Sequence, residues 1–162
     1  MLYQLIDDLN STEVDLRRKA AEGLSRHESA SAAAVSLARA SGDQDEQVRE
    51  WATAALEGMG GPSVEDAPAL AELLTASSAD TAYWAATLLG RLGERAAGVV
   101  PDLARAVESD GEIVVRQRAA WALGKIGRPA APAAESLRRA VTADDPRLAR
   151  LAKQALETIL DE

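Results

Sequence analysis

The clearest copy of a repeated unit in this chain reads Val-Arg-Gln-Arg-Ala-Ala-Trp-Ala-Leu-Gly-Lys-Ile-Gly, from Val115 to Gly127. Its central residue is Leu123, and a matching context surrounds Leu24, Leu56, Leu89 and Leu156. Successive copies are therefore 32, 33, 34 and 33 residues apart. A period held this closely is the sequence signature of a repeat array. We expect one structural unit to be built five times and stacked.

Each unit divides into two amphipathic segments that are joined by a turn. Residues 2–9 show the helical pattern first, with apolar side chains at i, i+3, i+4 and i+7. Acidic residues such as Asp43 and Asp110 precede the second segment, where they can cap a helix and complement its dipole. Further helices are expected over 13–26, 30–40, 45–58, 65–75, 79–92, 98–108, 112–126, 131–142 and 146–160.

Neither helix of such a hairpin can bury its apolar face alone, so neighbouring hairpins must stack. The sequence therefore predicts an all-α fold, an α-solenoid of ten helices in five hairpins. We expect a single domain over 1–162, with units of approximately 1–28, 29–60, 61–93, 94–127 and 128–162.

The composition agrees with closely packed helices. Hydrophobic residues make up 47% of the chain, many of them Ala, and Phe is absent. Cys is also absent, which excludes disulfides, thiolate metal sites and cysteine nucleophiles. The net charge of −8 disfavours nucleic acid as a partner. There is no basic leader and no apolar run of the roughly 18 residues that a membrane span needs, so we expect a cytoplasmic protein without membrane contact.

The unit resembles a HEAT repeat, especially the short bacterial and archaeal type that also occurs in phycobilisome lyases. The resemblance is carried by the Asp-containing turn, the Val-Arg pair, the double Ala and the Ala-Leu-Gly-x-Ile-Gly ending, which stand together between Asp110 and Gly127. Unit three departs from it with Thr81-Ala82 in place of Val-Arg, and unit five with Glu157 and Leu160 in place of the glycines. The resemblance implies that the second helix of each hairpin lines the concave side.

Four of the five aromatic residues lie on second helices. Counted from the Val position of each unit, Trp51 and Trp84 have offset 3, at the edge of the apolar stripe, whereas Tyr83 and Trp121 lie outside it. Rigid aromatic side chains on a surface of small residues are typical of a binding face. Trp51 and Trp84 have an equally good alternative role in packing between adjacent second helices. Tyr83 and Trp121 are expected to be exposed.

Basic residues also gather on the second helices. We expect Arg17, Arg49 and Arg116 to form ion pairs with turn acids such as Asp43 and Asp110. Other polar residues share the flank of the aromatic ones. The predicted partner-binding strip comprises Glu50, Trp51, Tyr83, Trp84, Gln117, Arg118, Trp121, Arg150 and Gln154.

Catalytic motifs are missing from the sequence. His27 is the only His, so neither a three-ligand zinc site nor a Ser/His/Asp set is readable. The pair His27-Glu28 is similar to the His-Glu pairs of HEAT-like deoxyhypusine hydroxylases, but those enzymes use several such pairs to hold iron. We expect no catalytic residue, no metal site and no cofactor, and we interpret His27 as a surface residue at the end of a repeat.

The leading interpretation is a monomeric, non-enzymatic scaffold that binds another protein or a peptide through its concave face. An alternative from the enzyme class is a lyase-like or chaperone subunit that handles a tetrapyrrole on a partner protein, as the resemblance to phycobilisome lyase repeats implies. A third possibility, nucleic-acid binding, would require an affinity that falls steeply with salt.

Overall fold

The computed structural model describes residues 1–161, and over that range it contains ten α-helices, four short 3-10 helices and no strand. This confirms the predicted all-α fold. The α-helices are α1 (Leu2–Leu9), α2 (Val14–Ser25), α3 (Ala34–Ala40), α4 (Glu46–Gly58), α5 (Ala67–Leu73), α6 (Ala79–Leu92), α7 (Val100–Glu108), α8 (Ile113–Ile126), α9 (Ala134–Val141) and α10 (Pro146–Leu160). The 3-10 helices are η1 (Ala30–Ala33), η2 (Val64–Asp66), η3 (Gly93–Val99) and η4 (Arg128–Ala133).

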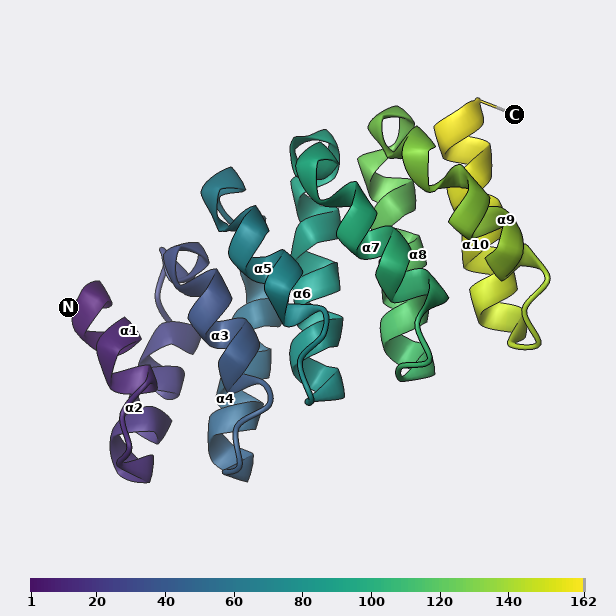
Figure 1. Ribbon diagram of the computed structural model, residues 1–162. Helices are drawn as coiled ribbons and strands as arrows, with labels where there is room; N and C mark the ends of the chain where they lie inside the picture. Colours follow the sequence, from purple (N-terminus) through teal and green to yellow (C-terminus); the bar gives the residue numbers. More distant parts are fainter. Residues whose placement is uncertain (162) are drawn as a thin grey trace.

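The helices pair into five hairpins that follow one another in a row, with the two ends of the chain at opposite ends of the stack (Figure 1). Odd-numbered helices form one layer and even-numbered helices the other. At three of the four junctions the even-numbered helices approach each other more closely than the odd-numbered ones do. The even-numbered helices therefore line the inner side of the curved stack, which is the predicted solenoid.

The first helices of units two to five begin differently from the prediction, which treated each as one continuous helix. Each opens with a 3-10 segment before the α-helix starts. A 3-10 helix has three residues per turn, so side chains at i and i+3 fall in one row. Ala30 and Ala33 form such a buried row in η1, and Ala130 and Ala133 repeat it in η4. The spacing of buried alanines thus suits the tighter helix.

The core follows the repeat. Leu24, Leu56, Leu89 and Leu123 are fully buried, and Ala residues fill most of the remaining inner positions. Leu156, in the last helix, is only partly buried because no further unit covers it.

Two Gly residues end the second helices of units three and four. Gly93 and Gly127 terminate α6 and α8 at φ 58° and 75°, in a region that residues with a Cβ rarely adopt.

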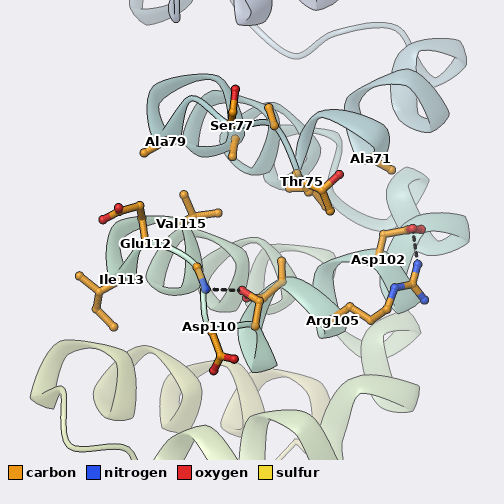
Figure 2. A pocket seen from close by; sticks show the side chains of 16 residues that line it. Ala71, Thr75, Ser77, Ala79, Asp102, Arg105, Asp110, Glu112, Ile113 and Val115 are labelled. Carbon is orange, nitrogen blue, oxygen red and sulfur yellow. Dashed lines mark hydrogen bonds and ion pairs between the residues drawn. The ribbon is translucent and has the colours of Figure 1, made fainter.

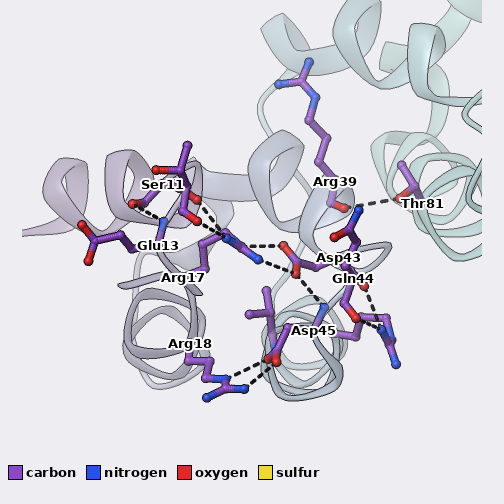
Figure 3. Close-up of polar contacts among 12 residues, drawn as sticks. Ser11, Glu13, Arg17, Arg18, Arg39, Asp43, Gln44, Asp45 and Thr81 are labelled. Atoms are coloured by element: carbon purple, nitrogen blue, oxygen red, sulfur yellow. Dashed lines mark hydrogen bonds and ion pairs between the residues drawn. The ribbon is translucent and has the colours of Figure 1, made fainter. Parts of the chain in front are cut away.

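An ion-pair ladder joins the turns of the first two units (Figure 3). Arg17 holds Asp43 through two hydrogen bonds of 2.9 and 3.1 Å. Arg18 holds Asp45 at 2.6 Å, and Asp45 also caps α4 by accepting from the Val48 backbone N–H. The Arg18 guanidinium, together with that N–H, lowers the pKa of Asp45 to about 2. Asp45 therefore supports the folded state above its ordinary pKa, and that support is lost as pH falls through about 2.

Two of the three predicted ladder arginines were assigned the wrong acceptors. Only Arg17 meets a turn acid, whereas Arg49 donates to the backbone carbonyls of Asp43 and Gln44, and Arg116 donates to that of Val107. The difference depends on which residue of the next unit faces each arginine. Where Arg17 finds Asp43, the corresponding positions in units three and five are Ala76 and Ala143, which offer no carboxylate.

The repeat register makes Leu123 far more sensitive to truncation than Lys125. Leu123 is completely buried and Lys125 is exposed. Leu123→Ala is expected to lower the free energy of unfolding by about 2–5 kcal/mol, and Lys125→Ala by no more than about 0.5 kcal/mol. Urea titration followed by circular dichroism measures both, and equal losses would refute the register.

The ladder predicts that Arg17 contributes more stability than an arginine in a purely surface pair. Arg17→Ala removes the bonds to Asp43 and to the carbonyls of Ser11 and Thr12, at an expected cost of about 1–3 kcal/mol. The matched control is Arg105→Ala, which removes an exposed pair with Asp102 within one helix and should change stability by less than about 0.5 kcal/mol. Thermal unfolding compares the two, and a control that costs as much as Arg17→Ala would contradict the structural role of the ladder.

Candidate partner-binding groove

The repeat register directs equivalent side chains of the even-numbered helices toward the preceding unit. Trp51, at offset 3 of α4, meets Arg26 at the end of α2, with the guanidinium carbon 5.4 Å from the ring centre. Arg118, at the same offset of α8, reaches back to Tyr83 of α6. Leu151, at this offset of α10, lines a hollow together with Trp121 of α8. Side chains from neighbouring units therefore meet along the inner face.

Arg118 forms the centre of this surface. Its guanidinium carbon lies 4.6 Å from the ring centre of Tyr83 and 4.6 Å from that of Trp121, and it donates a hydrogen bond to the Tyr83 hydroxyl. Cation–π contacts of this kind hold a charge over aromatic faces. Arg118, Tyr83 and Trp121 thus form one cluster across α6 and α8. The predicted gathering of aromatic and basic residues on one flank is present here, although the two rings are half-buried rather than exposed.

Glycines allow the close approach of the helices that carry this cluster. A Cβ added at Gly90 of α6 would overlap the Trp121 ring, which lies directly against the glycine. A Cβ added at Gly124 of α8 would come within 3.2 Å of the Ala155 backbone in α10. The Leu-Gly sequence of units three and four therefore sets the spacing of α6, α8 and α10.

The junction between α4 and α6 differs from the others. The backbones of these two helices barely approach each other, and α6 packs on α3 instead. Where α6 has Gly90 and α8 has Gly124, α4 has Glu57. Arg91 spans the junction by donating to the carbonyls of Leu56 and Met59 at 2.7 and 3.1 Å. Burial, followed by the nearby charge of Arg118, lowers the pKa of Arg91.

Two members of the predicted strip are buried in the folded chain. Trp84 is 9% exposed, packs edge-on against Tyr83 and lies 5.7 Å from the Arg91 guanidinium carbon, so packing is its principal role. Gln117 is 8% exposed and donates to Asp145, the capping residue of α10. That bond, after the one from the Leu148 backbone N–H, lowers the pKa of Asp145. Trp51 is half-buried, whereas Glu50, Arg150 and Gln154 are exposed.

Three shallow hollows run along the inner face and share residues. The first, of about 630 Å³, lies between α4 and α6 and includes Tyr83 and Trp84. The second, of about 130 Å³, includes Tyr83, Arg118 and Trp121. The third, of about 420 Å³, lies between α8 and α10 and again includes Trp121. Because Tyr83 belongs to the first two and Trp121 to the last two, the hollows form one continuous groove, which we call the inner groove.

A larger hollow, of about 700 Å³, lies outside the inner groove at the turn edge of units three and four (Figure 2). Its walls are the turn around Thr75 and Ser77 and the facing turn around Asp110 and Glu112. Ala82 lines it at the position that Arg17 occupies in unit one, so the arginine that lies there in unit one is missing in unit three. The departure of unit three from the Val-Arg pattern was visible in the sequence, but the resulting hollow was not predicted.

The residues that the sequence offered for catalysis or metal binding do not come together in the structure. His27 is half-buried, and its Nδ1 accepts a hydrogen bond from the Ser29 backbone N–H. Within the described part of the chain, no three His, Cys, Asp or Glu side chains gather closely enough to hold a metal ion. None of the helices between residues 1 and 161 combines the length and apolar character needed to cross a bilayer.

Stacked helical hairpins with a groove on the inner face define the class of α-solenoid proteins. The model of the family described as HEAT repeats matches residues 2–82 and 67–157. The chain belongs to the HEAT-repeat family.

Solved structures share this fold at low sequence identity. An engineered protein superposes with a TM-score of 0.65 at 23% identity, covering 99% of this chain and 79% of that one. The complex of CpcE and CpcF of phycocyanin lyase from Nostoc sp. PCC7120 gives 0.63 at 24% identity, covering 100% of this chain and 66% of that one. A designed armadillo repeat protein in complex with the peptide (KR)4 gives 0.64 at 15% identity, covering 98% and 81%. None of the curated proteins matches this chain in sequence.

The contact between Gly90 and Trp121 predicts different effects for two Gly→Ala changes, one in the last turn of α6 and one at the last residue of α4. Gly90→Ala should displace the Trp121 ring, lower the melting temperature and shift tryptophan emission to longer wavelength. Gly58→Ala is the control, because no atom lies within 4 Å of its added Cβ, so the melting temperature should stay close to that of the parent protein. Equal melting temperatures for the two variants would show that Gly90 does not set the helix spacing.

Proposed function

We propose that this protein is a non-enzymatic scaffold that holds a segment of another protein in the inner groove. The observation that carries the proposal is the cluster of Arg118, Tyr83 and Trp121 at the centre of a continuous groove. Large aromatic and Arg side chains dominate binding energy at protein interfaces. The exposed residues Glu50, Arg150 and Gln154 are the polar rim of that surface in this proposal, and the chain acts as a monomer.

The fold supports this proposal in a general way. The designed armadillo protein of similar fold is described with a bound peptide, and CpcE is described in complex with a partner subunit. The four even-numbered helices α4 to α10 are separated by about 10 Å where they pack and by more between α4 and α6, which gives a groove of at least roughly 30 Å. That length suits about ten residues of extended chain.

The experiment is selection of peptides from a displayed library, followed by affinity measurement on two triple variants. The groove variant carries Glu50→Ala, Arg150→Ala and Gln154→Ala, and the control carries Glu72→Ala, Arg95→Ala and Gln44→Ala, which lie elsewhere on the surface. All six side chains are exposed, so both proteins should melt close to the parent temperature. The groove variant should lose at least about tenfold in affinity, which corresponds to 1.4 kcal/mol.

An affinity that falls only in the control variant would place the binding surface elsewhere on the protein. Failure to select any peptide with the parent protein would contradict the scaffold proposal itself.

A lyase-like or chaperone role is the second candidate, supported by the likeness to the CpcE–CpcF complex. In that role the aromatic cluster would contact a tetrapyrrole carried by a partner protein. Titration with a free bilin separates the two functions, because pigment binding changes the visible absorbance spectrum. No spectral change at micromolar pigment would remove this candidate.

A further inference from the structure

The inner groove carries opposite charges in its two halves. The hollow between α4 and α6 is bordered by four carboxylates, from Glu46, Glu50, Glu57 and Asp80. None of the four takes part in an ion pair or a side-chain hydrogen bond with any residue in 1–161. The one cation there, Arg49, is held at the turn by two backbone carbonyls. This half is therefore acidic.

The half between α6 and α10 is basic. Its two hollows are lined by Arg118, Lys125 and Arg147, and no carboxylate is among their lining residues. Arg150 and Lys153, exposed on α10, add to the positive charge of this end of the chain. This half of the groove is therefore basic although the net charge of the chain is −8.

Several charges elsewhere on the molecule are neutralised by ion pairs with neighbours. Arg105 pairs with Asp102, Arg138 with Glu135, and Arg139 with Glu108. Separated, unpaired charges along one groove leave a field that points from its basic end to its acidic end. Such complementarity sets the orientation of a partner and excludes wrong ones more than it adds affinity.

We propose that the inner groove binds an extended segment made of a basic block and an acidic block, and that the charges of the groove fix which block lies over which half. The basic block lies over α4 and α6, and the acidic block over α8 and α10. The proposal rests on the scaffold function proposed above and adds the chemistry and polarity of the bound segment.

The floor of the groove favours an extended chain of this kind. Tyr83 and Trp121 lie at the two boundaries between hollows, so they can contact the middle of the segment while its ends meet opposite charges. A second copy of the protein fits less well, because two chains of net charge −8 repel each other at long range.

The test uses fluorescent peptides of about ten residues, long enough for the groove. Four are compared: a basic–acidic block peptide, its acidic–basic reverse, an all-basic peptide and an all-acidic peptide. Both block peptides should bind at least about tenfold more tightly than the two single-sign peptides, because either chain direction can place the basic block over the acidic half. The preference should weaken with added salt, since exposed charges are screened.

A charge-swapped protein provides the decisive comparison. Glu50→Lys and Glu57→Lys together with Arg147→Glu and Arg150→Glu leave the net charge unchanged and should reverse the placement of the two blocks. A spin label on the basic end of the block peptide reports this placement, because it should broaden the amide NMR signals of α4 in the parent protein and those of α10 in the charge-swapped protein. The matched control carries Glu72→Lys and Glu94→Lys with Arg95→Glu and Arg39→Glu, exposed residues outside the lining of the groove, and should keep the parent placement. Circular dichroism verifies that both proteins fold.

The outcomes separate this inference from the scaffold function. Equal broadening of the α4 and α10 signals by the spin label, or tightest binding of a single-sign peptide, would overturn the polarity while the groove still binds peptides. Concentration-dependent dimers in light scattering that vanish in the charge-swapped protein would replace the segment by a second copy and also overturn it. Absence of binding to every peptide, together with failure of the library selection, would overturn both proposals.

Discussion

The distance of closest approach between even-numbered helices controls the architecture of this protein. Where the last turn of a second helix contains Gly, as at Gly90 and Gly124, the next helix approaches until a side chain or the backbone meets the glycine. Ala at the buried positions permits the same closeness along the rest of the helix. Close approach on one side of a stack, with looser packing on the other, produces the curvature that makes an inner face. The inner groove thus exists because Gly and Ala allow the even-numbered helices to approach closely and curve the stack.

The fold could be predicted from the sequence because its determinants repeat. The period of the central Leu residues and the apolar pattern gave ten helices, and the structure has them. The 3-10 openings were not foreseen, since an i, i+3 pattern of alanines also fits the first turn of an α-helix. The sequence could have shown that Arg49 and Arg116 lack a carboxylate partner. A comparison of the units places Ala76 and Ala143 at the positions where an acidic residue would be needed.

Less of the groove could be predicted. Helical offsets correctly brought Tyr83, Arg118 and Trp121 to one flank. Offsets report direction around one helix, however, and not the distance to the next one. Burial of Trp84 depends on the gap between α4 and α6, and burial of Gln117 depends on the position of Asp145 in the following unit. Both are properties of neighbouring units that a pattern within one helix does not contain.

The junction between α4 and α6 is held differently on its two sides. Here α6 packs on α3 and approaches α4 less closely. On the inner side Arg91 ties the units by donating to the carbonyls of Leu56 and Met59. The acidic half of the groove lies over this junction, whereas the basic half lies over the directly packed helices α6, α8 and α10. A change in the angle between units two and three would therefore widen or narrow the acidic half and leave the width of the basic half unchanged.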